Sequence, residues 1–254
     1  TVMLSESERS AASRRALSLE NAFANPPLSG RRLRLGVVSA ELQQHSVAEF
    51  FEPLLVHFNR DRLHITLYPT TPGADARTAR FKELADQFIP LYGLSDQTAA
   101  EQIRSDRIDV LIDTTAHMNN SRLGIFARRA APVQCHYIGY HGTTGLTEMD
   151  WFIADNELLP PSCDEHFREK IWRLPRLWIA YRADSTLPVS GWQPDSNGTI
   201  RLGSFNNLTK VRSETLQLWA RTLNAIPGSM LLLKDRKAGD TSVQQRILRE
   251  LKAN

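Results

Sequence analysis

Several features that would mark the chain for a special environment are missing from its sequence. Only two of the 254 residues are cysteines, Cys135 and Cys163, and they stand in unrelated contexts without metal-ligand spacing. We therefore expect two free thiols in a reducing compartment. No apolar run approaches the roughly 20 residues of a membrane helix, and no charged and then apolar leader opens the chain. These absences predict a cytoplasmic protein that makes no use of a membrane.

Signatures of common nucleotide and nucleic-acid sites are also missing. There is no G-x-G-x-x-G or Walker loop, and no D-x-D pair stands in a suitable loop. The net charge is only +3, and the basic residues are scattered, which argues against nucleic acid as a partner. The cluster Arg31, Arg32 and Arg34 favours a solvated strand entrance over a binding stripe. A composition of 41% hydrophobic and 23% charged residues is ordinary for a globular protein.

From Leu33 onward, short apolar runs alternate with helical patterns. The runs that predict strands are 33–39, 65–68, 110–113, 133–140 and 151–154. The helical patterns fall at 47–58, 76–85, 95–106 and 121–129. Such alternation predicts an α/β fold whose mostly parallel sheet is covered by helices on both faces, with ligands at the carboxyl ends of the strands. We expect residues 31–187 to form this Rossmann-like first lobe.

The two ends of the chain have a different character. Residues 1–30 predict a helical connector, with a helix over 5–22 that Asn25-Pro26-Pro27 must end. Residues 188–199 are rich in Gly, Pro and Ser and predict a linker. The pattern then restarts with strands at 200–205 and 230–234 and helices at 213–225 and 241–252. Two strands and two helices are too few to form a stable independent domain. Residues 200–254 are therefore expected to be only the first part of a second lobe.

The stretch from Gly203 to Trp219 combines a strand end, an amide-rich loop, a lysine and a helix start. The strand delivers Asn207 and Lys210 to the loop, and Ser213 is predicted to cap the helix. Free N–H groups and the positive dipole end of such a helix attract anions, and a lysine adds a full charge. Spacing alone fits a capped helix with a solvated lysine equally well. The apolar face of the helix is expected to carry Leu216, Leu218 and Trp219.

Two histidines follow predicted strands and should stand at the carboxyl edge of the sheet. His45 comes after strand 33–39, and His117 closes the turn after strand 110–113. Imidazole titrates near neutral pH and suits general-base work. Without further information, a helix-capping or partly buried histidine is the better interpretation of His45. Asp113 could orient an imidazole, bind a sugar hydroxyl or bond to the backbone.

A glycine-containing turn, Tyr140-His141-Gly142-Thr143-Thr144-Gly145, follows the run at 133–140. Its glycines and threonines allow the backbone to approach a sugar closely. His136, which alternates with apolar neighbours, is interpreted as a structural histidine.

Four stretches, taken in order, resemble the protein O-GlcNAc transferase family. They are Arg34 to Leu55, Asp109 to Pro132, Tyr137 to Asp150, and the run FNNLTK with the helix after it. The resemblance implies a two-lobed GT-B-type fold that holds the nucleotide mainly in its second lobe. It also implies inverting transfer of GlcNAc from UDP-GlcNAc to Ser or Thr hydroxyls of proteins, with no metal or other cofactor. The expected partners are a nucleotide sugar and a protein or peptide acceptor.

The resemblance also implies roles for individual residues. His45, His117 and Lys210 would be catalytic, with Lys210 neutralising the departing diphosphate. Asn207 and Lys210 would contact the nucleotide. The expected substrate-binding residues are Asp113, Tyr140, His141, Gly142, Thr143 and Thr144.

The sequence departs from the family pattern at several positions. Glu49 replaces the second histidine of the family's H-P-x-x-H, and His141 replaces a proline, which leaves the donor sugar open. Ala116 and Met118 replace the glycine and threonine that flank the family's turn histidine. Loss of that glycine removes easy access to positive φ and predicts a reshaped turn.

Two other interpretations stay open. The related protein O-fucosyltransferase branch uses a GDP-sugar. Alternatively, the chain is a non-catalytic piece of such an enzyme that binds proteins or peptides, because further contacts of the family would lie beyond Asn254. We expect these 254 residues to be inactive by themselves.

Overall fold

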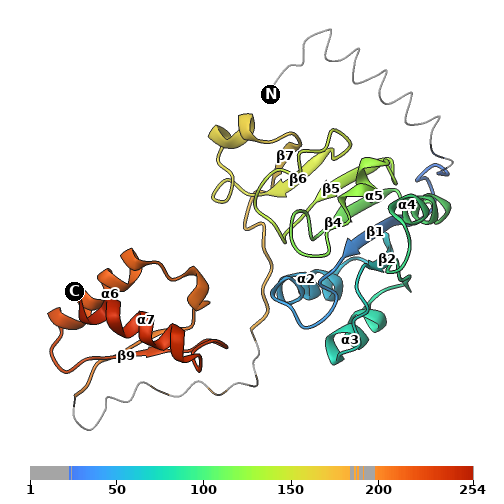
Figure 1. Cartoon of the computed structure of the whole chain (residues 1–254). Helices are drawn as coiled ribbons and strands as arrows, with labels where there is room; N and C mark the ends of the chain where they lie inside the picture. The colour runs from blue at the N-terminus through green and yellow to red at the C-terminus, as the bar shows by residue number, and fades with distance from the viewer. Residues whose placement is uncertain are drawn as a thin grey trace. The chain divides into compact units, whose positions relative to one another are not determined.

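The computed structural model describes residues 23, 25–183, 186, 188, 191 and 198–253, which belong to two compact units (Figure 1). The first unit comprises Thr1–Asp184 and the second Ser185–Asn254. The predicted connector helix at 5–22 and most of the predicted linker at 188–199 lie outside the described residues. Within the described part of the chain, no helix is long and apolar enough to cross a membrane.

A seven-stranded parallel sheet forms the centre of the first unit, with the strand order β3-β2-β1-β4-β5-β6-β7. The strands are β1 (Leu33–Ser39), β2 (Leu63–Pro69), β3 (Gln87–Phe88), β4 (Val110–Asp113), β5 (Val133–His136), β6 (Trp151–Ala154) and β7 (Lys170–Arg173). The helices are α2 (Ser46–His57), α3 (Ala76–Leu84), α4 (Asp96–Ser105), α5 (Leu123–Ala127) and the short 3-10 helix η1 (Pro161–His166). The predicted α/β fold with a parallel sheet is confirmed.

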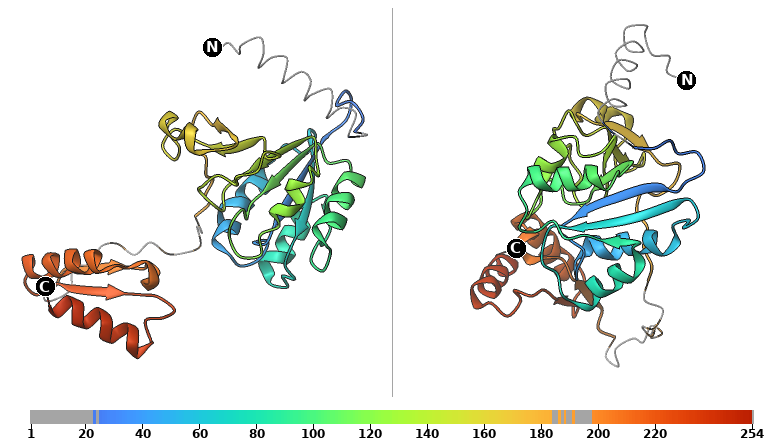
Figure 2. Two further views of the ribbon diagram at one scale, coloured as in Figure 1. Left: turned by 45° about the horizontal axis from the view of Figure 1, so that its top comes forward. Right: turned by 90° about the vertical axis from the view of Figure 1, so that its right-hand side faces the viewer.

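Helices cover both faces of this sheet (Figure 2). On one face Val37 of β1 packs with Phe51 of α2 in a core that α3 also joins. On the other face Val38 packs with Ile103 of α4 and Phe126 of α5. Successive strand residues point to opposite faces, so neighbouring residues of β1 serve two separate cores. Each fully buried side chain of this size stabilises the fold by about 1.5–3 kcal/mol.

The strand order places a topological switch point between β1 and β4. The chain proceeds outward from β1 to β2 and β3, then returns to pair β4 with the other side of β1. Val38 lies beside Asp113, which lies beside His136, so three strands end almost level. Ligands of open α/β sheets bind in the crevice at such a point, beyond the carboxyl ends of the strands.

One predicted strand was too long. The run at 133–140 leaves the sheet after His136, and Ile138 adopts a φ of +89°. Gly139 then passes so close to β4 that a Cβ atom there would lie 1.8 Å from the carbonyl oxygen of Thr114. Only glycine fits this approach, so apolar composition alone misplaced the strand end.

The second unit has a two-stranded parallel sheet of β8 (Arg201–Ser204) and β9 (Met230–Leu233). Its other elements are the 3-10 helix η2 (Leu208–Lys210), α6 (Ser213–Ala225) and α7 (Thr241–Lys252). Leu208, Leu216 and Ile247 belong to its small core. The predicted cap was wrong, because the N-cap residue of α6 is Arg212, without a side-chain cap bond. Leu218 is 53% exposed, so the buried face of α6 is narrower than predicted.

An ion-pair cluster fastens the chain entering the sheet to the start of β4. The Asp109 carboxylate accepts hydrogen bonds from the Arg31 guanidinium (2.7 and 2.9 Å), the Asn25 amide (2.8 Å) and the backbone N–H of Arg34 (2.8 Å). Burial alone would raise the pKa of Asp109, but these bonds and the charge of Arg31 hold it below its ordinary value.

This lowered pKa predicts an acid-sensitive contribution to stability. An aspartate whose folded pKa lies below its unfolded value of about 3.9 stabilises the fold above that pH and stops doing so as the pH falls through the folded pKa. We expect Asp109→Asn to lower the free energy of unfolding at pH 7 by about 1.5–3 kcal/mol, the range for hydrogen bonds to charged groups. Urea titrations from pH 7 to pH 2 should show this difference shrinking, whereas a constant difference would contradict the prediction.

Candidate functional site

The carboxyl edge of the sheet at the switch point is organised around a buried acid that the sequence analysis did not single out. Glu41 lies two residues after the end of β1 and is 5% exposed. Its Oε2 atom accepts hydrogen bonds from the hydroxyls of Thr115 (2.7 Å), Thr114 (3.2 Å) and Ser39 (3.2 Å). The Thr115 hydroxyl oxygen also accepts a bond from the N–H of Ala40 (3.1 Å). The turns after β1 and β4 are therefore joined through one carboxylate.

The electrostatics of Glu41 reflect its burial. Desolvation raises the pKa of this carboxyl, and the three hydroxyl bonds partly oppose the rise. The only sequence signal for this role is an acidic residue placed two positions after a buried strand.

His45 is exposed and is the N-cap residue of α2. Its Nδ1 atom accepts a hydrogen bond of 3.3 Å from the backbone N–H of Val47. When Nδ1 accepts, the proton of the neutral ring lies on Nε2, so in this geometry the free nitrogen is a donor. The capping role considered for His45 is thus present, and Nε2 is left without a hydrogen-bond partner among the described residues.

Asp113 and His136 form a buried pair at the ends of β4 and β5. His136 Nδ1 lies 2.7 Å from Asp113 Oδ2, and His136 Nε2 lies 2.9 Å from the carbonyl oxygen of Tyr140. A carbonyl oxygen can only accept, so His136 Nε2 donates its proton to Tyr140, while Nδ1 faces the Asp113 carboxyl group. Asp113 also accepts from the N–H groups of Thr115 (3.2 Å) and Ala116 (2.8 Å). Two of the alternatives considered for Asp113 are therefore present, bonding to the backbone and orienting an imidazole, which is that of His136.

The turn that carries His117 keeps a left-handed residue despite lacking glycine. Ala116 has a φ of +42°, and the bond from its N–H to Asp113 holds this conformation. A non-glycine residue there costs about 1–2 kcal/mol. The reshaping expected from the loss of glycine does not remove the positive φ.

His117 is exposed and lies against the glycine-containing turn. Its Nε2 atom is 3.2 Å from the carbonyl oxygen of Thr143, and its ring meets that of Tyr140 edge-on with centroids 5.3 Å apart. His141 lies edge-on to Trp178 at 5.4 Å. A Cβ on Gly142 would approach the Tyr140 ring at 3.0 Å, so this position favours a small residue. His117 and the 140–145 turn therefore form one assembly.

A second buried acid holds this turn. Glu169, 4% exposed, accepts hydrogen bonds from the hydroxyl of Thr143 (2.6 Å) and from the N–H (2.7 Å) and hydroxyl of Thr144. The Thr143 hydroxyl oxygen in turn accepts from the N–H groups of Gly145 and Arg168. Both threonines predicted to bind substrate are thus engaged with Glu169, which sequence reasoning missed because it lies 25 residues further along the chain.

Removing the Glu169 carboxylate should destabilise the fold. Glu169→Ala leaves two hydroxyls and one N–H without their acceptor, and each buried unpaired donor costs about 1–3 kcal/mol. We expect urea denaturation to show a loss of about 2–4 kcal/mol. The matched control is Glu165→Ala, whose side chain is 79% exposed and should change stability by about 0.5 kcal/mol at most. Equal losses for the two variants would contradict the anchoring role.

The predicted nucleotide-binding residues lie in the second unit. Asn207 is the N-cap residue of η2, and its Oδ1 accepts from the N–H (3.0 Å) and hydroxyl (2.6 Å) of Thr209. Lys210 is exposed at the end of η2, and its ammonium group has no hydrogen-bond or ion-pair partner in the described part of the chain. The described residues also contain no group of three or more His, Cys, Asp and Glu side chains placed to hold a metal ion.

Comparison with known proteins decides the family. The model of glycosyl transferase family 41 matches residues 17–184, about two thirds of the chain. The chain belongs to glycosyl transferase family 41. This confirms the resemblance to the O-GlcNAc transferases, and the matched range contains the entire switch-point edge.

Curated relatives and a solved structure agree with this assignment. The chain is 36% identical over 233 residues to the probable UDP-N-acetylglucosamine–peptide N-acetylglucosaminyltransferase SPINDLY of Petunia hybrida, and 27% identical over 221 residues to the SEC protein of Arabidopsis thaliana. These alignments cover 90% and 83% of the chain, but only 25% and 23% of those relatives.

A lysine-to-methionine mutant of the Thermobaculum terrenum O-GlcNAc transferase has a similar structure, with a TM-score of 0.82 and 34% identity. The match covers 95% of this chain and 48% of that one. It confirms the GT-B-type α/β architecture over the matched region.

Proposed function

We propose that the protein containing this chain transfers N-acetylglucosamine from UDP-N-acetylglucosamine to serine or threonine hydroxyls of proteins. The observation that carries the proposal is the family 41 match over residues 17–184. The names of the SPINDLY and SEC relatives, which describe peptide N-acetylglucosaminyltransferases, support the donor and the acceptor class. Solubility in the cytoplasm and independence of metal ions belong to the same proposal.

At the anomeric carbon of the sugar, the proposed reaction forms one bond and breaks one. The acceptor hydroxyl oxygen attacks the anomeric carbon with inversion, the bond from that carbon to the diphosphate oxygen breaks, and UDP departs with the bonding electron pair. The hydroxyl proton passes to a base. Negative charge therefore grows on the diphosphate, where a fixed cation stabilises the transition state most. Lys210 ends the short helix η2 that Asn207 caps, its ammonium group has no partner in the described part of the chain, and we assign it this role.

We assign the base to His45 despite its capping bond. The bond from the Val47 N–H to Nδ1 is long at 3.3 Å, and a bond of this kind contributes about 0.5–1.5 kcal/mol. General-base catalysis contributes about 10²- to 10⁴-fold, which is about 3–5 kcal/mol. Breaking the capping hydrogen bond when substrate binds therefore costs less free energy than general-base catalysis contributes. His117, held with the 140–145 turn, would position the sugar.

The direct test is a transfer assay with the full-length protein and a serine- and threonine-containing peptide. UDP-N-acetylglucosamine and GDP-fucose are offered separately, and mass spectrometry identifies the sugar on the peptide. We expect transfer of N-acetylglucosamine with release of UDP. Transfer from GDP-fucose alone would favour the O-fucosyltransferase alternative, and peptide binding without transfer from either donor would favour a non-catalytic role.

A further inference from the structure

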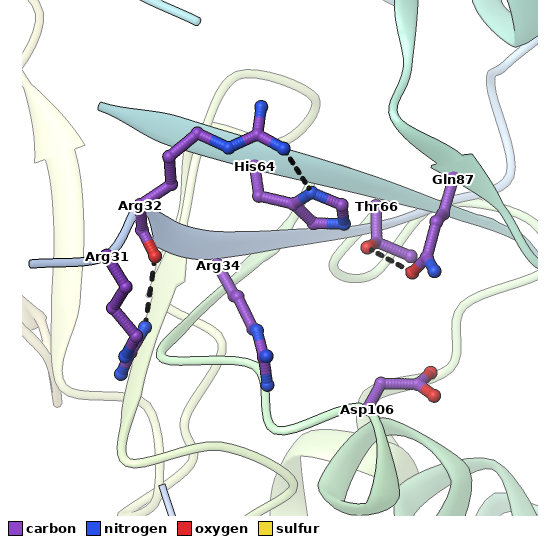
Figure 3. A pocket seen from close by; sticks show the side chains of 7 residues that line it. All are labelled: Arg31, Arg32, Arg34, His64, Thr66, Gln87 and Asp106. Atoms are coloured by element: carbon purple, nitrogen blue, oxygen red, sulfur yellow. Dashed lines mark hydrogen bonds between the residues drawn. The ribbon is translucent and has the colours of Figure 1, made fainter. Parts of the chain in front are cut away.

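A polar pocket lies at the opposite end of the β1–β2 pair from the candidate site. Its volume is about 370 Å³, and it opens on the face of the sheet that α4 covers further along (Figure 3). Arg34 of β1 lies beside His64 of β2, and Thr66 of β2 lies beside Gln87 of β3. Strand alternation puts the first three of these side chains on the same face as Val38 and Tyr68. The remaining lining residues are Arg31, Arg32 and Asp106.

The free polar groups in this pocket are hydrogen-bond donors. Arg32 Nη2 lies 3.1 Å from His64 Nδ1, and a guanidinium can only donate, so the proton of the neutral His64 ring lies on Nε2. Gln87 Oε1 accepts from the Thr66 hydroxyl at 3.2 Å, which leaves its NH₂ group as a donor. Within the described residues, His64 Nε2 and the Gln87 NH₂ group have no acceptor.

Two of the three arginines that line the pocket are held in ion pairs, and the third has no such partner among the described residues. Arg31 pairs with Asp109 and Arg32 with Asp86. The Arg34 guanidinium forms no ion pair or hydrogen bond with the described part of the chain. Asp106, the acid in the lining, already accepts from the Tyr68 hydroxyl (2.7 Å) and the Gln102 amide (2.9 Å).

The pocket therefore offers hydrogen-bond donors that have no acceptor among the described residues and a guanidinium that has no ion-pair partner there. An anion rich in hydrogen-bond acceptors fits these groups. We propose that the pocket lined by Arg34, His64 and Gln87 binds a phosphate group of a small molecule. Phosphate oxygens only accept at their ionised positions, and the planar guanidinium fork matches them in two-point contact. The source is either free phosphate or a phosphorylated metabolite, because 370 Å³ also accommodates a small organic part.

Calorimetric titration of the chain with inorganic phosphate and with glucose 6-phosphate, at constant ionic strength, tests this proposal. Arg34→Gln removes the charge but keeps a long polar side chain, and we expect it to weaken phosphate binding at least tenfold. The control Arg80→Gln removes the same charge from an arginine of α3 that pairs with Glu83, and should leave affinity within about twofold. Tighter binding of glucose 6-phosphate than of phosphate would identify a phosphorylated metabolite, and equal binding would identify the free anion.

Melting temperatures distinguish a loss of phosphate binding from a variant that merely folds poorly. Ligand that binds the folded chain raises its melting temperature, so phosphate should raise Tm in the parent and in Arg80→Gln but not in Arg34→Gln. The proposal is overturned if the parent binds neither ligand at about 10 mM, if Arg34→Gln binds as the parent does, or if both variants lose affinity equally. None of these outcomes depends on sugar transfer, so failure here leaves the proposed enzymatic function untouched.

Discussion

Replacing Lys210 with alanine in the full-length protein should lower kcat by about a hundredfold or more. Removal of one preorganised group that stabilises transition-state charge typically costs 10²- to 10³-fold. The Lys210 side chain is exposed and unpaired within the described residues, so the fold itself loses little, and stability should change by about 0.5 kcal/mol. Steady-state kinetics with a peptide acceptor, beside a urea unfolding curve, measure the two effects separately.

A matched variant separates a local role from a general loss of charge. Lys252→Ala removes the same charge from an exposed lysine in the last turn of α7 and should leave kcat near the parent value. Asn207→Ala should act mainly on the apparent affinity for the donor, because its amide is assigned to the nucleotide. Near-normal turnover by Lys210→Ala would remove the residue from the mechanism.

The second large effect concerns His45, for which two substitutions distinguish catalysis from capping. Asparagine is a good N-cap residue, so His45→Asn preserves an acceptor for the Val47 N–H but cannot serve as a base near neutral pH. His45→Ala removes both functions. We expect both variants to lose about 100-fold or more in kcat, and both to lose the limb of the pH–rate profile that reports deprotonation of the base.

Unfolding measurements complete the comparison. His45→Ala should be less stable than the parent by about 0.5–2 kcal/mol because the cap is lost, whereas His45→Asn should be nearly as stable as the parent. If His45→Asn restored turnover as well as stability, His45 would be only a helix cap.

Periodic patterns predicted the long elements of the fold well. α6 and α7 coincide with the predicted ranges because their apolar residues recur at helical spacing, and β1 and β4 coincide because each is a short, mainly apolar run. The two-residue strand β3 escaped prediction, because so short a run gives no periodic signal. The four-residue strand β7 also escaped, because its two apolar residues stand between the charged Lys170 and Arg173.

The site was harder to predict than the fold. The histidines could be placed at the carboxyl edge from their positions after strands. The groups that organise that edge are Glu41 and Glu169, and each acts on residues distant in sequence, up to 74 positions away for Glu41 and Thr115. Single-sequence reasoning has no signal for such pairs, because burial of a carboxylate depends on the packing of other segments. The positive φ of Ala116 was missed for a different reason, because a local hydrogen bond from its N–H to Asp113 supports a conformation that residue type alone disfavours.

The shared carboxylate of Glu41 has a consequence for how the site responds to a substrate. The loops that carry His45 and His117 follow different strands, yet residues at both strand ends donate hydrogen bonds to the Glu41 carboxylate. The two loops can therefore move independently only if these hydrogen bonds break. Substrate binding then freezes fewer degrees of freedom than two untethered loops would lose, which favours affinity through preorganisation. Thr115→Ala removes one of these hydrogen bonds and should therefore weaken substrate binding. The loops regain conformational entropy that binding must then remove, although Thr115 itself does not contact the substrate.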